Sequence, residues 1–159
     1  AIESFRELLR VSAEGSDDDI ADIVQKIHPR AVRKVADFLD LLHRNNAWCG
    51  LEFRDQHFKY NNIDQLSISE DRLREENIDE REESYFGEFQ GVLPQSRTFE
   101  FRVADGDSII KGKVDDGIED PDILNREWLH KPRRVTFDVV QVGQGRPRFT
   151  LKSLSKISS

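Results

Sequence analysis

The stretch TFEFRVADGDSIIKGKV, residues 98–114, decides the fold that this sequence predicts. Its first six residues alternate between apolar and polar side chains, which is typical of a strand with one buried face. Asp105 and Gly106 follow, and glycine tolerates the positive φ that a tight hairpin turn requires. Residues 108–114 then form the returning strand. The stretch therefore predicts a β-hairpin whose inward face carries Phe99, Phe101 and Val103.

A further strand is expected before this hairpin. Residues 85–93 contain Gly87 and Gly91, and a glycine inside a strand often marks a bend or a bulge. Pro94 then suits the second position of a turn, because its ring fixes φ. The three strands together predict a meander.

Two more strands are expected after the meander, at residues 134–142 and 148–154. A short helix over residues 120–129 precedes them, since Asp120 can cap it and Pro121 suits its first position. This order of three strands, one helix and two strands resembles the OB-fold, a small five-stranded barrel. An SH3-like barrel is the main alternative.

The N-terminal part of the chain shows helical periodicity instead. Apolar residues recur at helical spacing over residues 2–11, 16–27 and 30–45, and the third stretch has the widest apolar face. Residues 48–60 switch to a period of two and predict a hairpin. The fold class expected is therefore α+β, with a helical N-terminal half followed by a small five-stranded OB-like (alternatively SH3-like) β-barrel.

An acidic stretch separates the two halves. Between residues 64 and 88 there are ten acidic residues and three arginines. Ser67 and Glu70 have the spacing of a capping box, which predicts a short polar helix there. The predicted organisation is a helical region with a β-hairpin, an acidic linker or helix, and the barrel, over residues 1–63, 64–84 and 85–159 respectively.

Composition favours a soluble, cytoplasmic protein. Of the 159 residues, 36% are hydrophobic and 35% are charged, and no apolar run approaches the roughly 20 residues needed to span a bilayer. The start of the sequence lacks the basic-then-apolar layout of a signal peptide. The single cysteine, Cys49, excludes an internal disulfide and stands in an apolar setting, which predicts a buried, inert thiol.

The sequence predicts neither catalysis nor a cofactor or metal. Residues 143–145, Gly-Gln-Gly, lie between two strands and lack the following helix that a phosphate loop requires. The acidic pairs 115–116 and 119–120 are interpreted as a solvated connection and a helix cap. The histidines have no metal-binding spacing; they are His28, His43, His57 and His130.

One region is basic in a chain whose net charge is −7. From Arg126 onward there are eight basic residues and two acidic ones. We expect a basic strip on the last hairpin as the candidate site for nucleic acid or a partner, formed by Arg133, Arg134, Arg146, Arg148 and Lys152. We expect the chain's own acidic segment, residues 75–83, or a partner protein to lie against this strip; the alternative is that the strip binds nucleic acid.

Aromatic residues weigh against nucleic acid as the partner. Single-strand binders stack bases on exposed rings. The barrel phenylalanines share the phase of the aliphatic core residues, so we expect them inside: Phe99, Phe101, Phe137 and Phe149. Charge alone gives weak, salt-sensitive binding.

The function expected is that of a non-catalytic protein-binding or assembly module, with a nucleic-acid-binding barrel as the alternative. The helix at residues 30–45 has more apolar circumference than its neighbouring helix can cover. We therefore expect the barrel or a second copy of the chain to cover Phe38 and Leu42.

Overall fold

The computed structural model describes residues 2–47, 50–53, 56–74 and 76–158, and the chain forms two compact units. The helical unit contains Ala1–Asp79 together with Val140–Pro147. The barrel unit contains Glu80–Val139 together with Arg148–Ser159. The predicted fold class, a helical N-terminal half followed by a five-stranded barrel, is confirmed.

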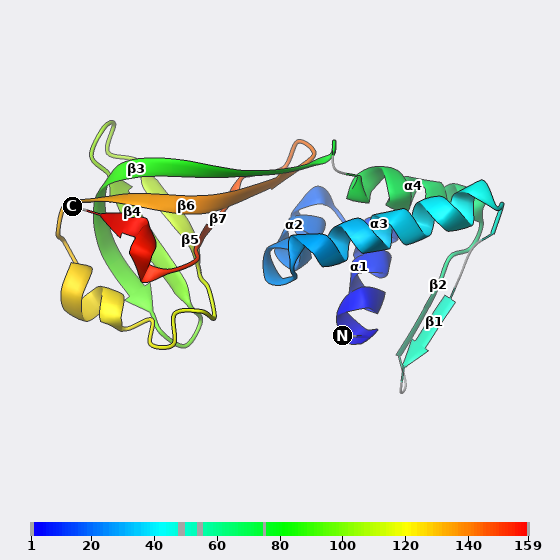
Figure 1. The fold of residues 1–159 in the computed structure, drawn as a ribbon, viewed down its shortest axis with the longest axis horizontal. Helices are drawn as coiled ribbons and strands as arrows, with labels where there is room; N and C mark the ends of the chain where they lie inside the picture. The colour runs from blue at the N-terminus through cyan, green and yellow to red at the C-terminus, as the bar shows by residue number, and fades with distance from the viewer. Residues whose placement is uncertain (1, 48–49, 54–55, 75, 159) are drawn as a thin grey trace. The chain divides into compact units, whose positions relative to one another are not determined.

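Four helices and one hairpin build the helical unit (Figure 1). Ser16 begins the second helix with a capping box, since its hydroxyl accepts from the Asp19 N–H and the Asp19 carboxylate accepts from the Ser16 N–H. Pro29 occupies the first turn of the third helix, where its missing N–H leaves no hydrogen bond unmade. The elements are α1 (Ile2–Glu14), α2 (Asp17–Lys26), α3 (Pro29–Arg44), β1 (Gly50–Phe53), β2 (Gln56–Lys59) and α4 (Ile63–Leu73).

The predicted capping box at the start of α4 is wrong. The helix begins four residues earlier than Ser67, and Asn62 caps it by accepting the backbone N–H of Gln65 at 2.9 Å. Glu70 consequently lies inside the helix, where it is buried. A long-range contact explains this burial, because His43 Nδ1 lies 2.7 Å from the Glu70 carboxylate.

The core of the helical unit includes a residue from a segment that lies, in sequence, between parts of the barrel unit. Leu8, Leu39 and Leu66 are fully buried there. Val142 is also fully buried there, and it comes from the tip of the last hairpin, residues 140–147. In that tip the backbone N–H of Gly143 donates to the Asn77 carbonyl at 2.8 Å. The helical core is therefore completed by residues 140–147, which are the end of one barrel strand and the loop before the next.

A closed sheet forms the barrel unit. Its order is β3-β4-β5-β7-β6, and a pairing between β3 and β6 closes it. The meander is antiparallel, whereas β5 and β7 are parallel. The strands are β3 (Ile78–Leu93), β4 (Thr98–Val103), β5 (Ile109–Val114), β6 (Arg133–Val142) and β7 (Arg148–Leu151), with a two-residue β8 (Ile157–Ser158) beside β6.

The first barrel strand is longer than predicted. Residues 78–84, interpreted from the sequence as part of the acidic connection, belong to β3. A Cβ at Gly87 would lie 2.0 Å from the Arg102 carbonyl oxygen, so the two backbones touch there. The pairing with β4 shifts register between Phe89 and Gly91, which is the predicted bulge.

Aromatic rings fill the barrel. Phe99 and Phe137 stack with ring centroids 5.2 Å apart, and Phe101 meets Phe137 edge-on at 5.4 Å. These three side chains are buried as predicted, and Phe149 is partly buried against them.

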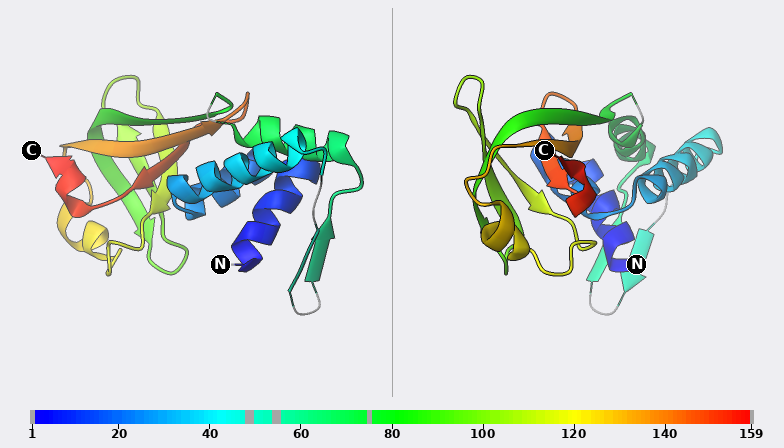
Figure 2. Two further views of the ribbon diagram at one scale, coloured as in Figure 1. Left: turned by 45° about the vertical axis from the view of Figure 1, so that its right-hand side comes forward. Right: turned by 60° about the vertical axis from the view of Figure 1, so that its left-hand side comes forward.

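A short π-helical turn, η1 (Leu124–Trp128), replaces the longer helix predicted over residues 120–129. It is the yellow coil beside the barrel strands in both views of Figure 2. Leu124 is fully buried in the barrel core. The Asn125 side chain exchanges two hydrogen bonds with the backbone of Val92, at 2.8 and 2.9 Å, which ties the turn to β3.

Candidate functional site

The predicted basic strip maps to two neighbouring strands and the loop between them. Arg133 and Arg134 begin β6, Arg148 begins β7 and Lys152 follows it. These four residues come from strands that are adjacent in the sheet. Arg146 lies in the loop, within the hairpin tip that belongs to the helical unit. The structure therefore divides the predicted strip between the two units.

Acidic side chains neutralise part of the barrel's basic surface. Lys152 Nζ lies 3.4 Å from an Asp115 carboxylate oxygen, and Lys156 Nζ lies 3.2 Å from one of Glu82. Glu82 belongs to the acidic stretch that the sequence analysis considered as a cover for the strip. Burial raises the pKa of the nearby Asp138 carboxyl, and the two lysines oppose this only in part.

The outward face of β3, β4 and β5 is also ion-paired. Arg102 bonds to Glu88, and Lys111 Nζ lies 3.5 Å from Glu100. An aromatic side chain that was not predicted for this face, Phe86, is exposed there. Its place two residues before Glu88 was the missed signal, because alternation gives both side chains the same face.

Leu93 and Ile109 are also exposed in the barrel, and they lie on other parts of the sheet than Phe86. Phe86 precedes Gly87, which pairs with Val103, whereas Ile109 pairs with Arg102 on the other side of β4. Leu93 lies at the far end of β3, beyond the ion-paired residues.

Histidines play structural roles in the helical unit. The His28 Nδ1 atom accepts the backbone N–H of Arg30 at 3.1 Å and so caps α3. His43 pairs with buried Glu70, whose other carboxylate oxygen lies 2.8 Å from Arg74. The remaining two histidines, His57 and His130, are exposed. Cys49, for which a buried thiol was predicted, lies outside the described residues.

The acidic pairs of the barrel form turns and caps. Asp115 accepts the backbone N–H of Gly117 at 2.9 Å, and Asp120 accepts that of Asp122 at 3.1 Å. Arg126 also bonds to Asp120 and holds the pKa of that carboxyl below its usual value. In the described ranges, no three His, Cys, Asp or Glu side chains are grouped to hold a metal ion.

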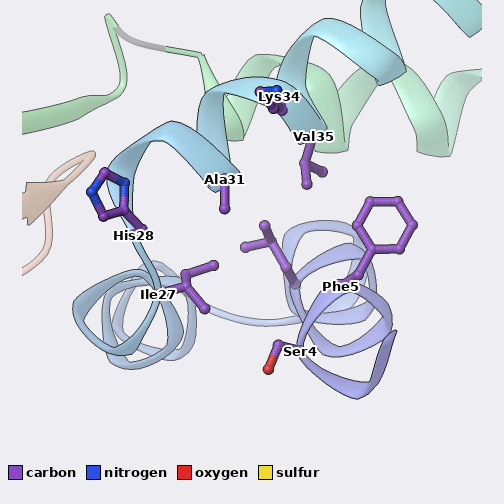
Figure 3. A pocket seen from close by; sticks show the side chains of 8 residues that line it. Ser4, Phe5, Ile27, His28, Ala31, Lys34 and Val35 are labelled. Atoms are coloured by element: carbon purple, nitrogen blue, oxygen red, sulfur yellow. The ribbon is translucent and has the colours of Figure 1, made fainter. Parts of the chain in front are cut away.

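An apolar pocket opens between α1, the end of α2 and the first half of α3 (Figure 3). Its volume is about 440 Å³, within the range of roughly 300–1,000 Å³ that is usual for binding pockets. Figure 3 shows the α3 side chains on one side and Phe5 and Ser4 of α1 on the other. The walls are Phe5, Leu8, Ile27, Ala31 and Val35, and the polar residues are Ser4, His28 and Lys34.

Exposed apolar residues continue from the pocket along α3. Phe38 is 37% exposed, although its ring centroid lies 6.2 Å from that of Phe5. Leu41 is 52% exposed. Leu42 is partly buried against the helical core. The uncovered helix face that the sequence predicted is therefore covered in part by its own unit, and Phe38 and Leu41 remain exposed.

This pocket was not predicted from the sequence. Its wall residues carry no motif, and their only signal is the excess apolar circumference of α3. Comparisons of the chain with protein-family models, curated proteins and solved structures find no match. Among the helices in the described part of the chain, none combines the length and apolarity needed to cross a bilayer.

Proposed function

We propose that this chain acts without catalysis as a protein-binding or assembly module, and that the helical unit carries the binding surface. The observation that supports this is the apolar pocket, continued by exposed Phe38 and Leu41 on α3. Exposed apolar residues next to a preformed hollow are typical of surfaces that bind proteins.

Site-specific photo-cross-linking tests this function. A photoreactive phenylalanine analogue replaces Ala31, an exposed wall residue, or Arg33, which is exposed on another side of the same helix. The full-length chain is then irradiated in a lysate of its source cells. We expect a discrete cross-linked protein from position 31 only, and its loss when Phe38→Asp is added. Equal products from both positions, or none, would contradict the proposal.

Nucleic-acid binding by the barrel is the second candidate. It is supported by Arg134, which is exposed and forms no ion pair with any described residue, and by exposed Phe86. A fluorescence titration with short single-stranded oligonucleotides at two salt concentrations distinguishes the two functions. We expect negligible binding near physiological salt. Micromolar binding that falls steeply with salt and is lost in Arg134→Glu would favour this second function.

A further inference from the structure

The exposed residues of α3 have the spacing of a helix-packing seam. Ala31, Lys34, Phe38 and Leu41 follow one another at intervals of three, four and three residues, and we call them the α3 seam. This is the alternation of the a and d positions along which two helices pack. All four side chains are exposed in the structure. The seam is therefore arranged to receive another helix.

The length of the seam favours a macromolecular partner over a small ligand. Ten residues separate Ala31 from Leu41, which corresponds to about 15 Å of helix. The pocket reaches only the part of the seam near Ala31 and Lys34. A small apolar molecule in the pocket would leave Leu41 uncovered, whereas an amphipathic helix laid along α3 would cover both.

Charge distinguishes the two ends of the seam. Arg30 and Lys34 lie one helical turn apart at its N-terminal end, and neither forms an ion pair with any described residue. Arg44 and Arg74, by contrast, each bond to an acidic side chain at 2.8 Å. The exposed acid on the same side is Asp37, one turn further along α3. The N-terminal end thus carries two cations that have no ion-pair partner among the described residues, in a chain whose net charge is −7.

We infer that the α3 seam binds an amphipathic α-helix of a partner protein, whose apolar stripe is flanked by carboxylates that face Arg30 and Lys34. This inference rests on the proposed protein-binding function and adds the chemistry of the partner. A second copy of this chain fits less well, because its own seam would present Lys34 where a carboxylate is needed.

A set of three synthetic helical peptides tests the inference. They share one stripe of leucine and phenylalanine and carry glutamate, glutamine or lysine at two flanking positions one turn apart. Binding to the full-length chain is measured by fluorescence anisotropy, and the site is mapped by amide shifts along α1 and α3. We expect the glutamate peptide to bind about fivefold more tightly than the glutamine peptide, and the lysine peptide most weakly.

Charge variants supply the matched control. Arg30→Gln/Lys34→Gln should remove the preference for the glutamate peptide over the glutamine peptide. Lys59→Gln/Lys113→Gln changes the net charge equally at two exposed lysines elsewhere and should preserve the preference. Circular dichroism checks that both variants are folded.

Other outcomes overturn the inference. Equal affinity for the three peptides, or binding of none, rules out an acidic helix at the seam; the cross-linking result from position 31 still decides the proposed function separately. Amide shifts in the pocket on adding decanoate, without a response to any peptide, would assign the site to a free anionic amphiphile. Concentration-dependent sedimentation that Phe38→Asp abolishes would assign it to a second copy.

Discussion

The inner face of the barrel sheet and the apolar face of α3 are covered to different extents in this protein. In the barrel, Phe99, Phe101 and Phe137 have at most 2% of their surface exposed, and charged residues outside them are paired with one another. In the helical unit, Phe38 and Leu41 stay exposed beside an open pocket. A sheet that closes on itself covers its inner face completely, whereas helices packed along stripes leave one stripe uncovered unless another element is added. The difference indicates that the sheet covers its own inner face, whereas α3 keeps an apolar face that its own unit covers only in part.

The largest effect is expected when two phenylalanines are compared. Phe137→Ala should lower the free energy of unfolding by about 3–5 kcal/mol, because it removes a ring that touches several others in a closed core. Phe38→Ala should cost less than about 1 kcal/mol, since that ring is partly in water already. Urea denaturation measures both. Similar losses in the free energy of unfolding for the two variants would contradict the difference between the two faces.

Two glycines of β3 test how closely the backbones of β3 and β4 approach each other. Gly87→Ala should cost about 2–3 kcal/mol, because its Cβ would overlap the carbonyl of Arg102. Gly91→Ala is the control: no atom lies within 4 Å of its Cβ position, so the change should stay within about 0.5 kcal/mol. Urea denaturation measures both variants. Equal free energies of unfolding for the two would contradict the close approach of the two backbones at Gly87.

Two valines of β6 test which core each end of the strand serves. Val142→Ala should cost about 2 kcal/mol and speed hydrogen exchange in α1 and α4, because Val142 belongs to the helical core. Val139→Ala should act on the amides of β4 and β5 instead, because Val139 belongs to the barrel core. If both variants loosened the same set of amides, the division into two cores would be wrong.

The smallest expected effect concerns the barrel's charged surface and its pH dependence. Burial raises the folded-state pKa of Asp138, so the fold favours its protonated form and stability falls as pH rises from the unfolded-state pKa through the folded one. Asp138→Asn should therefore stabilise the protein at pH 7, by less than about 1 kcal/mol, and have no effect at a pH below both values.

Glu88 should show the opposite sign. The Gln90 amide and then Arg102 lower its folded-state pKa, so its stabilisation is present above the unfolded-state pKa and is lost as pH falls through the folded one. Glu88→Gln should destabilise the protein at pH 7. Thermal unfolding of both variants across the acid range checks the two signs, and a shared sign would contradict this assignment.

Most of the barrel could be predicted because its signals are local. The alternation in β4 and the Asp-Gly turn after it each depend on a few neighbouring residues, and β4 has the predicted bounds. Residues 78–84 were misinterpreted because their acidic composition resembles a linker; pairing between β3 and β6 makes them a strand, and sequence composition does not show such pairing.

The functional surfaces depended on contacts that a single sequence does not show. Glu70 fitted a capping box by spacing, but its partner His43 lies 27 residues away in sequence. The pocket needed α1 and α3 to meet, which local patterns do not specify. The excess apolar face of α3 was visible in the sequence, whereas the four exposed positions that make the seam became visible only after α1 and α4 were in place.

The contribution of Val142 to the helical core also bears on how the chain can be divided. A fragment that ends at Asp79 contains every helix of that unit but lacks Val140–Pro147. Such a fragment would expose the gap that Val142 fills, so it should aggregate or fold poorly by itself. Mixing it with a second fragment that starts at Glu80 restores the missing segment. The two pieces should then reassemble by complementation, as the halves of a split reporter do.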